Sequence, residues 1–378
     1  METDKKKTGT WLYLFFIGVI TVFTTINLYE FLTRKEPDGR LLGLNSMITV
    51  EDSAITLWGG IQHLMGKELA FGSTTYEDVT MLRNGYATMA DLDPNYEAAI
   101  TGITGAKELA DEIGADFLYV AVPSKQRYAS DYPEGITCYA VEKYDAVVSY
   151  ARHNDIPVLD MKSVLESTGE EWFDYFYYSD HHWRNNAAFM AYQEICLYMQ
   201  SCGVEITEEY TTKEAYSVTL YEDVFLGTHG RMAGPLYAGL DDYDLWLPNF
   251  ETEFTLSVPS EGIYKEGTFE ECFVNYENLA SYSYDYYAYY AYLKEDFELF
   301  EITNEANANG PHVVIVRDSS AVPVSVFLAT QCSELDIIDL RYTSDNHAIE
   351  YVTEKNPDFI IYLFGAGYLG NEGAMIMR

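Results

Sequence analysis

The chain has 378 residues, of which 60 are Asp or Glu and 23 are Lys or Arg, and its formal charge is −37. This length excludes a peptide hormone or a small disulfide scaffold, and a hydrophobic fraction of 48% is typical of a folded core. So negative a chain is not expected to bind nucleic acid, because phosphate contacts need clustered Lys and Arg. Cys196 and Cys202 could pair, but the odd total of five Cys favours free thiols.

An apolar segment near the N-terminus, WLYLFFIGVITVFTTINL at 11–28, contains no charged side chain. About 20 helical residues span the hydrocarbon core of a bilayer. Three lysines at 5–7 precede the segment and predict that the N-terminus stays in the cytoplasm. A cleaved signal peptide is the alternative, although no cleavage site of small residues follows. We therefore predict a single-pass protein of the cell membrane, held in the cytoplasmic membrane by this helix.

The acidic charge lies on one side of the predicted anchor. Residues 1–40 hold six basic and five acidic side chains, whereas residues 41–378 hold 17 and 55, a net charge of −38. Such a surface repels anionic head groups and attracts cations. The predicted organisation is a cytoplasmic tail over 1–10, a transmembrane anchor over 11–29, a linker over 30–49 and one extracytoplasmic domain over 50–378.

Apolar runs and amphipathic stretches alternate along the predicted domain. Strands are predicted over 116–122, 156–160, 312–317, 335–339 and 359–364. Helices are predicted over 139–153, 185–201, 322–331 and 348–355. This alternation indicates an α/β fold, a parallel sheet flanked by helices on both faces. Sites in such sheets form at the carboxyl ends of the strands.

Residues 205–300 do not show this alternation of strands and helices, and we predict that they form a small β-rich insertion. Tyrosines crowd its end, at Tyr282, Tyr284, Tyr286, Tyr287, Tyr289, Tyr290 and Tyr292. They could form an aromatic platform for sugar rings. The interpretation we favour is a packing element whose hydroxyls stay in water.

Two short strings carry residue types used in nucleophilic catalysis. The string YSDHHW at 178–183 precedes a predicted helix, and RDSS at 317–320 follows a predicted strand. A Ser at a strand-to-helix junction projects its hydroxyl from the sheet edge, where turn N–H groups can stabilise an oxyanion. His182 could act as the base for this Ser and Asp180 as the partner that orients the base.

The same residues have structural alternatives. Ser319 could be the N-cap of the helix that follows, and Asp180 or Ser179 could cap the helix that begins near Trp183. In that case their oxygens would satisfy backbone N–H groups at the helix ends. Spacing alone leaves both interpretations open.

Metal binding is a further alternative. A site would be built on Asp180, His181 and His182 with His229, His347 or a carboxylate as the remaining ligand. The acidic surface could also bind Ca²⁺, and a melting temperature that rises with added metal would reveal it. The scattered positions of the additional ligands make this signal unspecific.

The string SDHHW resembles the signature of the bacterial DHHW family. That family is similar to the SGNH-hydrolase-like proteins of alginate O-acetylation, which carry a D-x-H-W motif. Further strings follow in the order expected for the family: NGY at 84–86, YVAVPSK at 119–125, FLGT at 225–228, YDLWLP at 243–248, VRDS at 316–319 and IDLRY at 338–342. The resemblance covers about residues 50–378.

The resemblance implies a permuted SGNH-hydrolase-like fold in which Asp180 orients, His182 is the base and Ser319 is the nucleophile. It implies acetyl transfer or ester hydrolysis on a carbohydrate or cell-envelope polymer, without a cofactor. A membrane-bound acyl-transfer partner would supply the donor. The residues expected to contact substrate are Lys125, Trp183 and Arg341, although ion pairs with carboxylates are an equal alternative for Lys125 and Arg341.

Two positions depart from the family pattern. The residue before Asp318 is Arg317 rather than the usual Gly, and the residue after Ser319 is Ser320 rather than an aromatic. Both flank the expected oxyanion turn. The alternative to an enzyme is therefore a catalytically drifted, non-enzymatic binding or scaffold module of an envelope polysaccharide assembly.

Overall fold

The computed structural model describes residues 17–18, 21–22, 25, 51–70, 79–343 and 347–378. The predicted tail, anchor and linker lie outside these residues except for five positions of the anchor, so the anchor stays a prediction. Within the described part of the chain, no helix combines the length and the apolar character needed to cross a bilayer.

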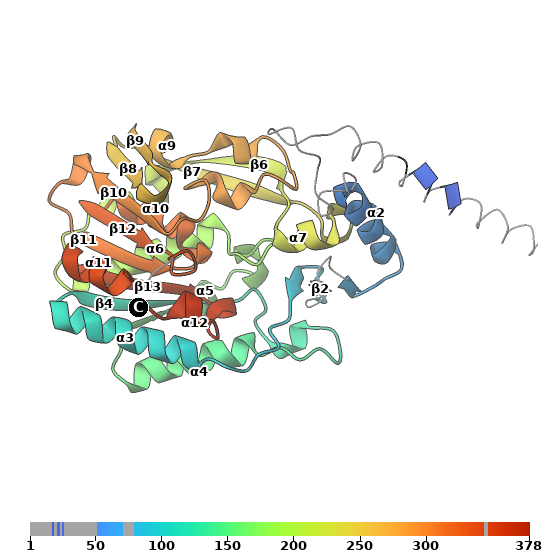
Figure 1. Cartoon of the computed structure of the whole chain (residues 1–378), viewed down its shortest axis with the longest axis horizontal. Helices are drawn as coiled ribbons and strands as arrows, with labels where there is room; N and C mark the ends of the chain where they lie inside the picture. Colours follow the sequence, from blue (N-terminus) through green and yellow to red (C-terminus); the bar gives the residue numbers. More distant parts are fainter. Residues whose placement is uncertain (1–16, 19–20, 23–24, 26–50, 71–78, 344–346) are drawn as a thin grey trace, which may run out of the picture.

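An eight-stranded sheet forms the centre of the molecule, in the order β5-β4-β13-β11-β12-β10-β8-β9 (Figure 1). The parallel strands are β5 (Val158–Asp160), β4 (Asp116–Val122), β13 (Phe359–Gly365), β11 (His312–Arg317) and β12 (Glu334–Ile338). The antiparallel strands are β10 (Leu299–Asn304), β8 (Phe254–Val258) and β9 (Ile263–Gly267).

The prediction of a parallel sheet is therefore correct for five strands and wrong for three. A short turn over Pro259–Glu261 joins β8 to β9, and strands joined so closely pair antiparallel. Residues 205–300, predicted as an insertion, also hold a separate ribbon of β6 (Tyr216–Phe225) and β7 (Asp241–Pro248) and the helix α9 (Phe269–Phe273). The segment is thus rich in strands, as predicted, and β8 and β9 extend the central sheet.

Helices cover both faces of the sheet. One face packs against α5 (Met161–Ser167), α6 (Asn185–Ser201) and α10 (Val322–Ala329). The other packs against α3 (Glu97–Ile113), α4 (Ala140–His153), α11 (Ala348–Lys355) and α12 (Glu372–Met375) (Figure 1). Along β4, Leu118 and Val120 face the first core and Phe117 and Tyr119 the second. Burial of both faces explains why the strands read as continuous apolar runs.

A smaller group of elements lies beside the sheet, on the right of Figure 1. It consists of α2 (Glu51–Leu64), α7 (Thr228–Ala233), α8 (Pro235–Ala238) and the strands β1 (Leu69–Ala70), β2 (Val79–Met81) and β3 (Ala87–Met89). Val79, Ala87, Ala233 and Tyr237 form its core. This group brings α7 to the edge of the sheet that holds the candidate site.

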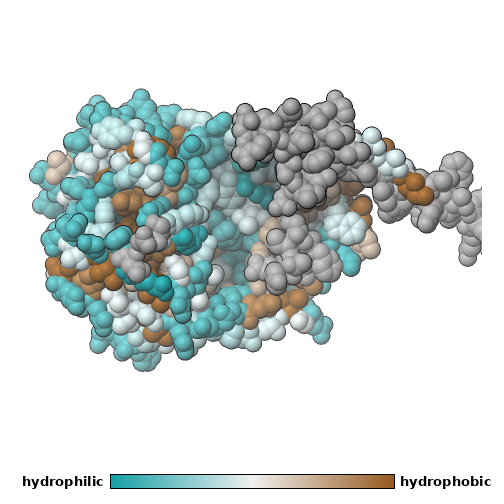
Figure 2. All heavy atoms as spheres, viewed as in Figure 1, coloured by the Kyte–Doolittle hydropathy of each residue, from teal (hydrophilic) through white to brown (hydrophobic). Residues whose placement is uncertain are grey.

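The five cysteines are free thiols, as the sequence favoured. Four of them are buried and Cys202 is exposed, so Cys196 and Cys202 are not paired. Most of the surface in the view of Figure 2 is hydrophilic, with apolar residues in small groups.

Candidate active site

Two loops meet at the carboxyl ends of the parallel strands. Strand β11 ends at Arg317, and the 3-10 turn Ser319–Ala321 then leads into α10. The loop before α6 carries the D-x-H-W string. The Trp183 indole is 1% exposed, and its Nε1–H donates to the Ser320 carbonyl at 2.9 Å. Trp183 thus joins the two loops and is not free to contact substrate.

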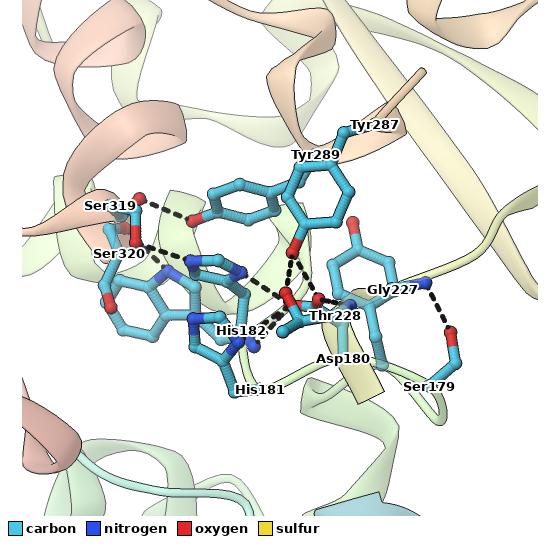
Figure 3. A network of polar contacts seen from close by, with 12 residues as sticks. Ser179, Asp180, His181, His182, Gly227, Thr228, Tyr287, Tyr289, Ser319 and Ser320 are labelled. Carbon is cyan, nitrogen blue, oxygen red and sulfur yellow. Dashed lines mark hydrogen bonds and ion pairs between the residues drawn. The ribbon is translucent and has the colours of Figure 1, made fainter. Parts of the chain in front are cut away.

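Ser319, His182 and Asp180 form a continuous hydrogen-bonded series (Figure 3). The Ser319 Oγ lies 2.7 Å from His182 Nε2, and His182 Nδ1 lies 2.5 Å from Asp180 Oδ1. If His182 Nδ1 carries the hydrogen, Nε2 can accept the hydroxyl proton of Ser319. This is the relation between nucleophile, base and orienting carboxylate that acyl transfer requires.

Neither Ser319 nor Asp180 nor Ser179 is the N-cap of the helix that follows it. Asp318 caps the turn after β11, because its side chain accepts the Ser320 N–H at 2.7 Å. The N-cap of α6 is Arg184, without a side-chain hydrogen bond to the helix. The Ser179 hydroxyl donates to Asp241 at 2.7 Å. The side chains of Ser319 and Asp180 are thereby left for contacts with His182.

The Asp180 carboxylate is completely buried and fully hydrogen-bonded. Its Oδ1 also accepts the His182 N–H at 2.9 Å, and its Oδ2 accepts the Thr228 N–H at 2.6 Å and the Tyr287 hydroxyl. Burial opposes ionisation, but the neighbouring His181 and His182 and these hydrogen bonds outweigh it and hold the pKa of Asp180 well below its usual range. The carboxylate is therefore charged at neutral pH.

Gly227 allows the chain to pass directly over Asp180. A Cβ at Gly227 would lie 2.3 Å from the Asp180 Cβ and 2.5 Å from the Ser179 carbonyl oxygen. Without a side chain, the backbone comes close enough for the Thr228 N–H to reach the carboxylate. The FLGT string, which ends at the first residue of α7, is thus part of the site.

A pocket of about 490 Å³ opens beside Ser319 and His182. Its charged walls consist of Arg231, Lys294, Arg341, Glu277, Asp285, Glu295 and Asp296. Tyrosines of the Tyr-rich segment and of the loops that follow β12 and β13 also line it: Tyr286, Tyr287, Tyr290, Tyr342 and Tyr368. A polar cavity of this size with aromatic walls suits a ligand of the size of a sugar unit or two.

Arg341 lies in the pocket wall but is paired within the protein. Its guanidinium contacts Asp339 at 2.8 and 2.5 Å, Asp296 at 2.8 Å and the Tyr368 hydroxyl at 2.8 Å. Arg317 is 1% exposed and pairs with Asp296, and with Asp339 at 3.1 Å. Arg317, where the family usually has Gly, therefore completes a largely buried cluster of two Arg and two Asp, of which Arg341 and Asp296 line the pocket.

Lys125 does not line the pocket. Its side chain is 1% exposed, and Nζ donates to the carbonyls of Ala87 and Tyr177 at 2.6 and 2.7 Å and of Tyr178 at 3.2 Å. Burial lowers the pKa of Lys125 to about 8. The structure thus gives Lys125 a role in joining β3 to the loop of the D-x-H-W string rather than in contacting substrate.

The Tyr-rich segment differs from the interpretation we favoured, a packing element with its hydroxyls in water, whereas the aromatic platform for sugar rings stays a prediction. The ring of Tyr289 stacks on His182, with centroids 3.7 Å apart, and its hydroxyl donates to the Ser319 carbonyl at 2.9 Å (Figure 3). Tyr287 contacts Asp180, and Tyr290 donates to Asp296 at 2.6 Å. These hydroxyls bind protein groups instead of water. Only the crowding of tyrosines signalled these residues in the sequence.

Three neighbouring residues could hold a metal, but most of their donor atoms already take part in hydrogen bonds within the protein. Donor atoms of Asp180, His181 and His182 lie within 4.8 Å. However, both Asp180 oxygens and both His182 nitrogens take part in the hydrogen bonds described above. His229 is near, with its ring 5.9 Å from that of His181, whereas His347 is exposed and contacts Glu350. A metal would have to break the series from Ser319 to Asp180.

The turn N–H groups expected to stabilise an oxyanion are partly used by Asp318. Its carboxylate accepts the Ser320 N–H at 2.7 Å and the Gly365 N–H at 2.6 Å. Burial raises the pKa of Asp318. The backbone N–H of Ser320 is therefore used by the turn itself. An oxyanion would have to accept hydrogen bonds from other donors.

A buried Ser-His-Asp series at the carboxyl edge of a parallel sheet defines a hydrolase-like α/β protein. The family described as SGNH hydrolase-like domain, acetyltransferase AlgX, matches residues 82–311, well over half of the chain. The chain belongs to this family, and the resemblance drawn from the sequence is confirmed. The matched residues include Asp180 and His182 and end before Ser319. No curated protein matches the chain.

Solved structures show the same fold at low sequence identity. PatB1 of Bacillus cereus is 19% identical, with a TM-score of 0.65 over 79% of this chain and 99% of that one. PatB1 with a sulfonyl adduct is 17% identical, with a TM-score of 0.63 over 82% and 100%. A DHHW family protein from Eubacterium siraeum is 17% identical, with a TM-score of 0.60 over 82% and 99%.

Proposed function

We propose that this protein transfers acyl groups, acetyl above all, or hydrolyses their esters on a carbohydrate or cell-envelope polymer. The observation that carries the proposal is the distance of 2.7 Å between Ser319 Oγ and His182 Nε2, with Asp180 on the other ring nitrogen, in the wall of an open pocket. Family membership supports the reaction class.

The mechanism follows from the order of the three groups. Ser319 Oγ attacks the acyl carbon while His182 Nε2 takes the hydroxyl proton, and Asp180 stabilises the imidazolium that forms. His182 then returns the proton to the leaving oxygen, which departs and leaves an acyl-Ser319 ester. In the second half, an acceptor hydroxyl or water gives its proton to His182 and attacks this ester, so that Ser319 regains its hydrogen.

The acyl acceptor binds in the pocket beside Ser319, where tyrosine rings and charged groups line the walls. We place this domain outside the cytoplasm, behind the predicted anchor at residues 11–29, where a membrane-bound partner would deliver the acyl donor. This location rests on the apolar N-terminal sequence and its preceding lysines.

An aryl sulfonyl fluoride tests the proposed nucleophile in the full chain. We expect stoichiometric labelling, found by mass spectrometry on the peptide that contains Ser319, because His182 activates this hydroxyl. The sulfonyl adduct held by PatB1 supports the choice of probe. Ser319→Ala and His182→Ala should prevent labelling, whereas Ser325→Ala on α10 should not, since that hydroxyl is buried against the Ala321 carbonyl. Labelling of Ser319→Ala at the wild-type rate would contradict the proposal.

A second candidate function is a non-enzymatic binding or scaffold module of an envelope assembly. The Asp318 carboxylate, which occupies two N–H groups beside Ser319, favours it. The same experiment separates the two functions. An unlabelled wild-type protein that still binds an oligosaccharide would support the module, and labelling at Ser319 would support the enzyme.

The acidity of the chain predicts which acceptors it uses. Residues 41–378 carry a net charge of −38, so an anionic polymer is repelled and a neutral one is not. We expect kcat/KM for an anionic oligosaccharide to rise about tenfold between low and physiological salt, because salt screens the repulsion. The value for a neutral oligosaccharide should stay constant. Turnover of the anionic acceptor that falls with added salt would contradict this expectation.

A further inference from the structure

Tyr287 contacts the carboxylate of the proposed triad from the side opposite to His182. The residue comes from the Tyr-rich segment, 107 positions after Asp180, and its hydroxyl donates to Asp180 Oδ2. Its ring lies under the guanidinium of Arg231, 4.6 Å from the ring centroid. Figure 3 shows the Tyr287 hydroxyl directed at Asp180 and Thr228.

The direction of each hydrogen bond follows from the number of hydrogens available. Tyr287 has one hydroxyl hydrogen, which goes to Asp180. The Thr228 hydroxyl, 2.9 Å from the Tyr287 oxygen, must therefore donate to it. The Thr228 N–H donates to the same Oδ2 at 2.6 Å. Two donors thus hold Oδ2, and Oδ1 is left facing the two N–H groups of His182.

We propose that Tyr287 is a positioning residue for acyl transfer, which acts through Asp180. The terminal torsion of an Asp side chain is soft, so the donors on Oδ2 fix the plane in which the carboxylate meets the His182 ring. A hydrogen bond to an anion also stabilises it and so weakens proton binding by the Asp180–His182 pair. This role rests on the proposed function, and it makes a residue of the Tyr-rich segment part of the reaction machinery.

Other ionisable groups surround Asp180 and stay in place when Tyr287 is changed. They are His181 and His182 on its own loop, His229 on α7, Lys125 after β4 and Tyr289 on the Tyr-rich segment. His182 and Tyr287 are the described side chains that hydrogen-bond to the carboxylate. A change confined to the Tyr287 hydroxyl therefore removes its hydrogen bond to Asp180 and the one that the Thr228 hydroxyl donates to it, and leaves the Thr228 N–H on Oδ2.

The test is Tyr287→Phe in the full chain, which removes the hydroxyl and keeps the ring. The carboxylate loses one donor, so the Asp180–His182 pair binds a proton more tightly. We expect the protonation midpoint of the pair, followed by the carbon-13 resonance of the Asp180 carboxylate, to rise by about one pH unit. The acidic limb of the kcat/KM profile should move by the same amount. Thermal melting of the variant checks that it is folded.

Tyr290→Phe is the matched control. Tyr290 lies on the same segment and also donates to a carboxylate, but to that of Asp296. The protonation midpoint of the Asp180–His182 pair in this variant should equal that of the wild type. Equal midpoints for all three proteins would overturn the role of Tyr287. The NMR titration needs no turnover, so a shifted midpoint in a protein whose Ser319 stays unlabelled would contradict the proposed function alone.

Discussion

Replacing Ser319 with alanine is expected to lower acetyl release from an aryl acetate by about four to six orders of magnitude. The reason is that no other described hydroxyl is held by His182 Nε2, which lies 2.7 Å from Ser319 Oγ. His182→Ala should cost about as much, and the double variant no more than either single one, because the two groups act in one step. Steady-state release of the aryl leaving group measures all three.

The controls separate lost chemistry from lost structure. Asp180→Asn keeps the shape of the side chain but presents an amide to His182, and a loss of about 10⁴-fold is expected. Ser325→Ala removes a buried hydroxyl outside the site and should stay within about threefold of the wild type. Release by Ser319→Ala at more than about a tenth of the wild-type rate would exclude Ser319 as the nucleophile.

Arg317→Met is expected to destabilise the protein by about 3–5 kcal/mol, the largest stability effect we predict. The variant leaves the carboxylates of Asp296 and Asp339, both almost completely buried, to share Arg341 alone. An uncompensated buried charge is much more costly than a lost surface pair. Urea unfolding at neutral pH, followed by tryptophan fluorescence, gives the difference in free energy.

A matched control is Arg152→Met, which removes an Arg that contacts Asp160 at 2.9 Å with more than half of its side chain exposed. A loss below about 1 kcal/mol is expected there. If the two variants lost equal stability, the buried cluster would not have the energetic role we assign to it.

The cost of Arg317→Met should also depend on pH. Burial opposes ionisation of Asp296, but Arg317 and Arg341 outweigh it and lower its pKa to about 2. A depressed pKa of an acid stabilises the fold above the ordinary pKa of about 4, and this contribution is lost as the pH falls through 2. The difference in stability between wild type and Arg317→Met should therefore shrink between pH 5 and pH 2.

The sequence alone predicted the parallel half of the fold. Buried strands such as 116–122 and 312–317 read as unbroken apolar runs because helices cover both faces of the sheet, and this pattern is local. A β-rich segment was predicted over 205–300, but its antiparallel pairing with the central sheet was not, because β10 pairs between β12 and β8 and the pairing of distant segments leaves no periodic signal. The transmembrane anchor that the sequence predicts lies outside the described residues except for five positions, and it stays a prediction.

Residue types and their spacing also indicated three candidate catalytic residues, and the resemblance to the DHHW family gave each of them its expected role. Asp180 and His182 stand in one short string, and Ser319 follows a strand, so each could be named from its neighbours along the chain. Only the tertiary structure brings Ser319 to His182 across 137 positions, and Tyr287 to Asp180 across 107. Only the tertiary structure, too, shows that Lys125 and Trp183 are buried and that Arg317 and Arg341 pair with buried carboxylates. A hydrogen bond depends on direction and distance in space, and the order of residues along the chain does not contain either.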